Sequence, residues 1–185
     1  MSVFERLRSV FPVTWTTALV GWEGLGVLSP WPGRWTEFPP LLRISDLVSY
    51  ASERLIASSS AKEEKLIVDL LEMEQAGQTR EAIRGVIGVL SAIDGGECAR
   101  ELRKWRVIML QDVISRLPPD PTQALLALTE FWQNFGFPID GPHEVQGRGN
   151  NTAPEDYYRA STLQRMIEHH QAWMAHEITE LKAAA

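Results

Sequence analysis

The sequence predicts an all-α protein: an irregular array of antiparallel helix pairs, similar to an α-solenoid, in a single domain over residues 1–185 with a long C-terminal helix. Apolar residues recur at helical spacing through most of the chain, which is typical of helices with one buried face. Between about residue 45 and residue 135 these periodic segments are joined by short loops, and short connections make neighbouring helices antiparallel. No alternating strand pattern stands out, and no fixed period marks a regular repeat protein.

The chain begins with a short predicted helix over residues 2–11, which Pro12 ends because proline has no backbone N–H. The next segment, from Trp15 to Leu25, places tryptophan, alanine and leucine side chains on one helical face. Its glycines weaken the end of this second helix, since each costs about 1 kcal/mol relative to alanine.

Residues 29–40 combine four prolines with a glycine and three aromatic residues, which precludes a regular helix. We expect an ordered loop whose Trp31, Trp35 and Phe38 pack onto the body of the protein, because large aromatic side chains are usually buried. An exposed aromatic binding surface is the alternative for this segment.

Three helices are predicted between about residue 45 and the turn at Asp94. The first begins at Ser45 or Asp46, and Ser60 with Glu63 forms a capping-box pattern for the second. Thr79 opens the third. The acids expected on the outer face of the second helix are Glu63, Glu64, Asp69, Glu72 and Glu74. The residues expected to face inward are Leu47, Val48, Ala51, Leu55 and Ile56 in the first helix, Leu66, Ile67, Leu70, Leu71 and Met73 in the second, and Ile83, Val86, Ile87, Leu90 and Ile93 in the third.

Two amphipathic helices follow between Cys98 and Pro138, and the proline pair at 118–119 separates them. Asp120 is the predicted N-cap of the second of these helices, and Gly136 its C-terminal stop. The predicted faces are Leu102, Trp105, Met109, Val113 and Leu117 in the first, and Ala124, Leu128, Phe131 and Phe135 in the second, broadened by Leu110, Ile114, Leu125 and Trp132.

Residues 136–153 form a long loop without periodicity, and such loops are often functional or disordered. The C-terminal helix is predicted over residues 154–183, with Thr152 and Glu155 as a capping box. Its expected stripe is Leu163, Ile167, His170, Met174, Ile178 and Leu181, with Tyr157, Met166 and Trp173 beside it. We expect His170 to be a packed side chain rather than a ligand.

Composition excludes several classes of protein. The net charge of −6 and the pI near 5.3 argue against a nonspecific nucleic-acid binder, which carries a basic face. No apolar run approaches the length of a membrane span, and the N-terminus is not a secretory signal. A lone cysteine, Cys98, forms no intrachain disulfide and fits a reducing compartment, so we expect a cytoplasmic protein.

Catalytic and metal-binding motifs do not appear in the sequence. His169 and His176 lie about two helical turns apart, too far to share one metal ion, and no HExxH motif is present. The glycines at 147–149 lack the lysine of a phosphate loop. Cys98 has no local histidine partner, so a structural role is favoured. We therefore expect no metal, no cofactor and no enzymatic activity.

Charge placement is the pattern with functional content. Six acidic residues lie between Asp120 and Asp156, and Arg148 is the single basic residue among them. This excess is compatible with an ordinary solvated surface or with a surface that binds a protein partner. The residues predicted to bind the partner are Asp140, His143, Glu144, Glu155 and Asp156.

Three stretches resemble a bacterial family of immunity proteins that are encoded beside polymorphic toxins. They are Trp15–Leu25 with its Gly21-Trp22 pair, Ile44–Ala51, and Arg103–Pro138, whose second helix ends in Phe-Gly-Phe-Pro. The resemblance implies a small helical protein that binds and neutralises a toxin made by the same cell. It implies no particular site residues.

Two functions follow as hypotheses. The first is an immunity protein that covers the active or substrate-binding face of a cognate toxin domain; the basic surface of a nuclease toxin would meet the predicted acids. The second is a helical scaffold or adaptor that holds a peptide or partner helix in a groove. Neither hypothesis involves direct contact with nucleic acid or a membrane.

Overall fold

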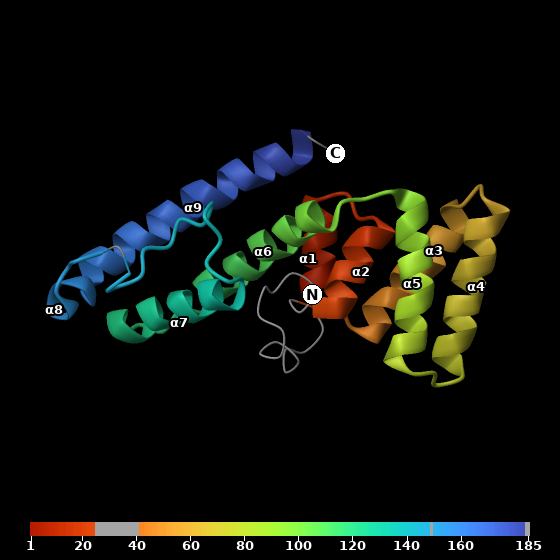
Figure 1. Cartoon of the computed structure of the whole chain (residues 1–185), viewed down its shortest axis with the longest axis horizontal. Coiled ribbons are helices and arrows are strands. Elements are labelled where there is room, and N and C mark those ends of the chain that lie inside the picture. The colour runs from red at the N-terminus through yellow and green to blue at the C-terminus, as the bar shows by residue number, and fades with distance from the viewer. Residues whose placement is uncertain (25–40, 149, 184–185) are drawn as a thin grey trace. The chain divides into compact units, whose positions relative to one another are not determined.

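The computed structural model describes residues 1–24, 41–148 and 150–183, and these residues form helices and connecting loops (Figure 1). The β-pairing within the described residues consists of one isolated antiparallel bridge, between Val145 and Arg148. The helices are α1 Val3–Val10, α2 Trp15–Glu23, α3 Ile44–Ala57, α4 Ala61–Gln75, α5 Arg80–Asp94, α6 Cys98–Ser115, α7 Pro121–Asn134, α8 Pro154–Tyr157 and α9 Ala160–Ala183. The all-α prediction and the long C-terminal helix are confirmed.

The contacts group the chain into two compact units, unit 1 (Met1–Trp105) and unit 2 (Arg106–Ala185), and the boundary falls inside α6. In unit 1, α2 and α4 both pack on α5, and α3 packs on α4. Short turns between α3, α4 and α5 make these neighbours antiparallel, as predicted (Figure 1). The Trp/Pro-rich segment 29–40, with Trp31, Trp35 and Phe38, lies outside the described residues.

Local capping residues begin several helices. The hydroxyl of Thr79 accepts a hydrogen bond from Ala82 N, and the Asp120 carboxylate accepts one from Gln123 N at 2.9 Å, as the sequence predicts. The helix α3 begins at Ile44, earlier than the predicted Ser45 or Asp46, and no side chain caps it.

The prediction for Glu63 is wrong. The sequence pattern places this residue on the outer face of α4, but only 7% of the residue is exposed. Its carboxylate accepts hydrogen bonds from Trp15 Nε1 at 3.0 Å and from Arg54 at 2.6 Å. Ser60 caps the helix by accepting from Glu63 N, yet the reciprocal half of the predicted capping box is replaced by these inward contacts. A carboxylate is tolerated at a buried position when several donors satisfy its oxygens.

The inward faces of α3 and α5 are narrower than predicted. Ile56 is 88% exposed and Ile93 is 41% exposed, whereas Tyr50, which the pattern did not include, is buried. Both isoleucines lie in the last turn of their helices, where fewer neighbouring elements cover the side chains. Helical spacing therefore predicts side-chain burial more accurately in the middle of these two helices than in their last turns.

The helix α6 is buried on more than one side. The predicted stripe included Trp105, which is indeed buried, but Lys104, Arg106, Val107 and Ile108 are buried as well. Lys104 Nζ donates to Pro12 O at 3.0 Å and to Glu101 Oε1 at 2.8 Å. These bonds satisfy a charge that the chain holds away from water.

In unit 2, α7 packs against α9. The apolar core residues of this unit are Val107, Ile108, Leu110, Ala124, Leu125, Leu128, Phe131, Trp132, Tyr157, Met166, Met174 and Leu181, and His170 is buried among the helices that carry them. The packed role predicted for His170 is therefore confirmed.

The C-terminal helix is interrupted. Instead of one helix from residue 154, a single turn, α8, ends at Tyr157, and α9 begins at Ala160. Thr152 does not cap it: the N-cap is Ala153, without a side-chain bond, and proline at the first position needs no acceptor. The buried Tyr157 hydroxyl donates to Glu144 O at 2.5 Å, a contact that holds this turn against the long loop. No helix in the described ranges is both long and apolar enough to cross a membrane.

Candidate functional site

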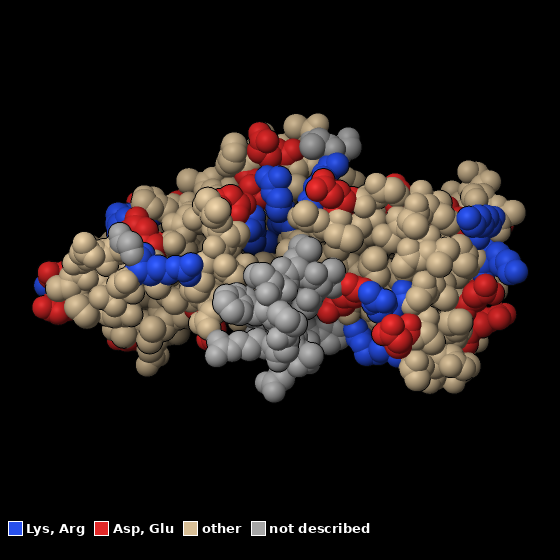
Figure 2. All heavy atoms as spheres, in the orientation of Figure 1, with Lys and Arg blue, Asp and Glu red and all other residues tan. Residues whose placement is uncertain are grey.

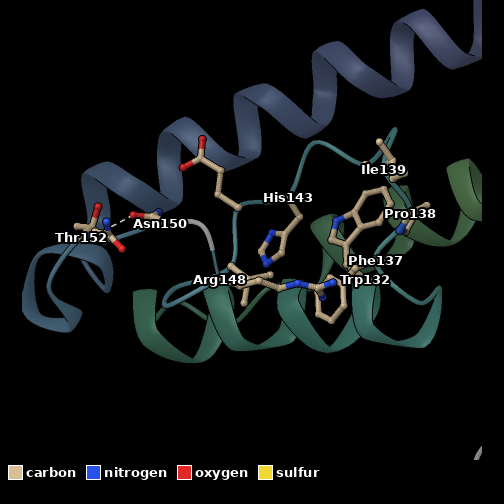
Figure 3. A pocket seen from close by; sticks show the side chains of 12 residues that line it. Trp132, Phe137, Pro138, Ile139, His143, Arg148, Asn150 and Thr152 are labelled. Atoms are coloured by element: carbon tan, nitrogen blue, oxygen red, sulfur yellow. Dashed lines mark hydrogen bonds between the residues drawn. The ribbon is translucent and has the colours of Figure 1, made fainter.

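An open pocket of about 530 Å³ lies on unit 2, between the long loop 136–153 and the helix α7 (Figure 3). Its lining includes Trp132 from α7 and Phe137, Ile139, His143, Arg148 and Asn150 from the loop. The loop predicted to carry function therefore forms the wall of a concave surface, where ligands and partner side chains bind most readily.

The turn at the rim of this pocket is held at three points. The Arg106 guanidinium, 7% exposed, pairs with the Asp140 carboxylate at 2.5 Å. Trp173 Nε1 donates to Asp140 O at 2.7 Å, and Gly141 N donates to Pro138 O at 2.9 Å. The turn is thereby fixed, and it displays Ile139 with its side chain fully exposed.

Phe137 has the left-handed backbone conformation, with φ of 50°, directly after Gly136 at φ of 70°. Its N–H donates to Trp132 O at 2.9 Å, which closes the C-terminus of α7. A non-glycine residue with positive φ is strained, and such strain is concentrated at functional sites.

Arg148 lies at the opposite side of the loop and reaches across to Phe137 (Figure 3). Its guanidinium carbon is 4.8 Å from the centre of the Phe137 ring, a cation–π contact. A turn holds the arginine backbone in place, because Arg148 N donates to Val145 O and the preceding Gly147 has φ of 77°. Among the described residues, no carboxylate forms an ion pair with this guanidinium.

The hydrogen bonds of His143 define its tautomer. Thr129 Oγ1 lies 2.9 Å from His143 Nε2 and donates its own hydrogen to Leu125 O. His143 Nε2 therefore carries the proton, and Nδ1 is a buried acceptor without a partner among the described residues. Burial, together with the nearby His170, lowers the pKa of His143 to about 4, so the ring is neutral at pH 7.

Glu144 also lines the pocket, but Arg165 from α9 pairs with it at 2.7 Å. This hydrogen-bonded pair lowers the pKa of the Glu144 carboxyl below its usual value. The carboxylate stays charged at neutral pH while the arginine offsets its charge.

The five residues predicted to bind a partner do not form one cluster. His143 and Glu144 line the pocket, and Asp140 lies on the anchored turn beside it. Glu155 and Asp156 are exposed on α8 and are not among the lining residues. Their binding role remains a prediction.

The charge excess expected for this region is partly offset in the structure. Asp140, Glu144 and Asp156 pair with Arg106, Arg165 and Arg159, and all three arginines lie outside the stretch from Asp120 to Asp156. Acidic and basic side chains are interspersed over the described residues of the face in Figure 2. The pocket therefore has a different electrostatic character from the one the local sequence predicted.

The sequence reasoning missed Ile139 and the Phe137–Arg148 contact. One signal for Ile139 was available, since an isoleucine between proline and aspartate in a turn has few neighbours to bury it. No cluster of three histidine, cysteine or carboxylate side chains suited to a metal ion occurs in the described part of the chain. The interactions that the described residues of the site offer to a partner include apolar contact, ion pairing and cation–π stacking.

A model of one protein family, described as "Uncharacterized protein conserved in bacteria (DUF2247)", matches residues 5–178. No curated protein and no solved structure matches the chain.

Proposed function

The chain belongs to this uncharacterized bacterial family, whose model covers nearly all of it, and from that premise we propose that it is an immunity protein for a polymorphic toxin. It binds a cognate toxin domain and neutralises it by occluding the active or substrate-binding surface. The inhibitor acts stoichiometrically in the cytoplasm, and it catalyses no reaction.

One observation carries the proposal: the loop 136–153 presents a fully exposed isoleucine on a turn that is already fixed. Apolar side chains held in place before binding make good interface anchors, because little conformational entropy is lost when a partner covers them. The pocket beside Ile139 offers a concave surface for a side chain of the toxin domain.

Inhibition by occlusion requires an interface of sufficient buried area and complementary shape. Tight inhibitor complexes bury roughly 1,600 Å² in total, of which about half lies on each partner. The pocket and its rim would form the centre of such an interface, and the surrounding polar side chains its edge. The toxin's substrate is then excluded by steric overlap.

The exposed acidic residues Glu155 and Asp156 extend the proposed toxin-binding surface onto α8. If the toxin is a nuclease, its basic substrate-binding face would meet the exposed Glu155 on α8, outside the pocket. Such charges mainly set the association rate and the register of the complex.

A helical scaffold or adaptor is the second candidate. Val89 on α5 is 47% exposed beside the exposed Ile93, and this apolar helix face favours docking of a partner helix. A stable complex with a peptide or helix, formed in the absence of any toxin domain, would support this alternative.

The test of the first proposal is co-expression with the toxin-domain protein encoded beside this chain's gene. We expect the two proteins to co-purify and the producing cells to survive expression of the toxin domain. Cell death at equal toxin levels, with a folded partner that does not co-purify, would discard the proposal.

Reversal of three charges, Asp140→Lys, Glu144→Lys and Glu155→Lys, tests the predicted acidic contacts. Weaker protection with an unchanged circular dichroism spectrum would support them. Unchanged protection would remove these residues from the interface while leaving the immunity function intact.

A further inference from the structure

The geometry of the pocket points to the chemistry of the partner. We infer that the toxin domain presents an acidic side chain, Asp or Glu, to Arg148, and an apolar hollow to Ile139. This inference rests on the proposed function and specifies the partner's surface at that site.

Three arginines near the long loop each hold a carboxylate of this chain: Arg106, Arg159 and Arg165. Arg148 is exposed and has no such carboxylate within the described residues. The loop's acids are thus paired internally, and the charge left at the pocket for a partner is positive.

The Arg148 guanidinium rests near the Phe137 ring, at 4.8 Å from its centre. Stacking on a ring leaves the in-plane N–H groups of a guanidinium available, and these match the two oxygens of a carboxylate. Phe137 has a strained left-handed backbone, with φ of 50°, and in this conformation its ring lies against the Arg148 guanidinium.

Ile139 is fully exposed, whereas the adjacent Asp140 is held through both its carboxylate and its carbonyl oxygen. The isoleucine therefore cannot turn inward without breaking those contacts. A partner with a matching apolar hollow removes this side chain from water at little conformational cost.

Other occupants fit the same observations less well. A basic segment would bring like charge against Arg148. A small anion would pair with Arg148 but would leave Ile139 in water. A carboxylate next to an apolar hollow satisfies both groups at once.

The experiment measures the affinity of the full-length protein for the toxin domain by isothermal titration calorimetry. We expect Arg148→Glu and Ile139→Asp each to weaken binding about tenfold or more, as central interface residues do. The matched controls are Arg116→Glu, an arginine directly after α6 whose side chain is 73% exposed, and Ile56→Asp, an isoleucine that is 88% exposed on α3. We expect both controls to bind as the unchanged protein does, and circular dichroism checks that all four variants fold.

A photo-reactive amino acid at position 139 identifies the contacting segment of the toxin domain by mass spectrometry. A cross-linked peptide that contains Asp or Glu beside aliphatic residues supports the inference. A peptide rich in Lys or Arg overturns it.

The outcomes separate the inference from the function. If the unchanged protein neither binds nor protects, the proposed function fails and the inference fails with it. If the unchanged protein binds and the two pocket variants bind equally well, the inference is wrong and the function stands. A thermal shift caused by inorganic phosphate that Arg148→Glu abolishes, with toxin affinity unaffected, would replace the protein contact by a small-anion site.

Discussion

Trp132 Nε1 donates a 2.7 Å hydrogen bond to His170 Nε2, and both residues are almost wholly buried. An indole N–H can only donate, so His170 Nε2 is the acceptor and its proton resides on Nδ1, which lies 2.5 Å from Met166 O. The His143 ring is 5.5 Å away, centre to centre, and it too is neutral. Unit 2 thus holds two uncharged histidines in one cluster beside the pocket.

This pair predicts a pH dependence of stability. Burial lowers the pKa of both rings, to about 4 for His143, whereas an unfolded histidine has a pKa near 6.5. Between those values the unfolded chain binds more protons, so the free energy of unfolding falls as the pH decreases from about 6.5 toward 4. Each histidine contributes a slope of at most about 1.4 kcal/mol per pH unit. Urea unfolding at several pH values above 5 measures the slope, and it should become shallower in His143→Gln.

Trp132→Phe should destabilise unit 2 by about 2–4 kcal/mol, because it leaves His170 Nε2 without a donor and opens space in the core. Trp173→Phe is the matched control. Its Nε1 donates to Asp140 O near the surface, and water can replace that bond at a cost of about 1 kcal/mol. Chemical unfolding followed by circular dichroism compares the two variants. Equal losses would contradict the importance assigned to the buried bond.

Gly21 and Gly85 should respond oppositely to alanine. A Cβ on Gly21 would meet the indole of Trp105, 2.9 Å from Cε2, so Gly21→Ala should cost about 1–3 kcal/mol through overpacking. No heavy atom lies within 4 Å of the corresponding position at Gly85, where alanine improves helix propensity by up to about 1 kcal/mol. Thermal unfolding of both variants tests the opposite signs, and a stabilised Gly21→Ala would refute the close packing.

Glu63→Ala should cost about 2–3 kcal/mol, because Trp15 Nε1 would be left buried without an acceptor and Arg54 would lose the nearer of its two carboxylate partners. Glu72→Ala, at an exposed position of the same helix, should change the free energy of unfolding by less than about 0.5 kcal/mol. Urea unfolding distinguishes the two. A similarly small change in the free energy of unfolding for both variants would contradict the importance assigned to the buried contacts of Glu63.

Local signals were sufficient to predict most helix starts. A cap such as Asp120 or Thr79 acts on a backbone N–H three residues later, so the sequence contains both partners of the interaction. The stop at Gly136 is similarly local, since it depends on a conformation that glycine adopts without strain. These features mark where helices of the all-α architecture begin and end.

Contacts between distant segments were not predictable in the same way. Glu63 has the polarity of a surface residue, and its burial depends on Trp15, which lies 48 positions away in the sequence. The negative charge of the loop is likewise offset by arginines of α6 and α9, whose positions follow from how these helices pack. Periodicity describes one element at a time, so the electrostatics of the pocket became visible only with the fold.

Lys104 offers a chemical reporter for unit 1. Its amine is enclosed by Pro12 O and Glu101, with 2% of the side chain exposed, whereas Lys62, Lys65 and Lys182 are all exposed. An acylating reagent added to the native protein should label those three lysines quickly and Lys104 only when this region opens transiently. The labelling rate of a single peptide would then measure how often the interior of unit 1 is breached.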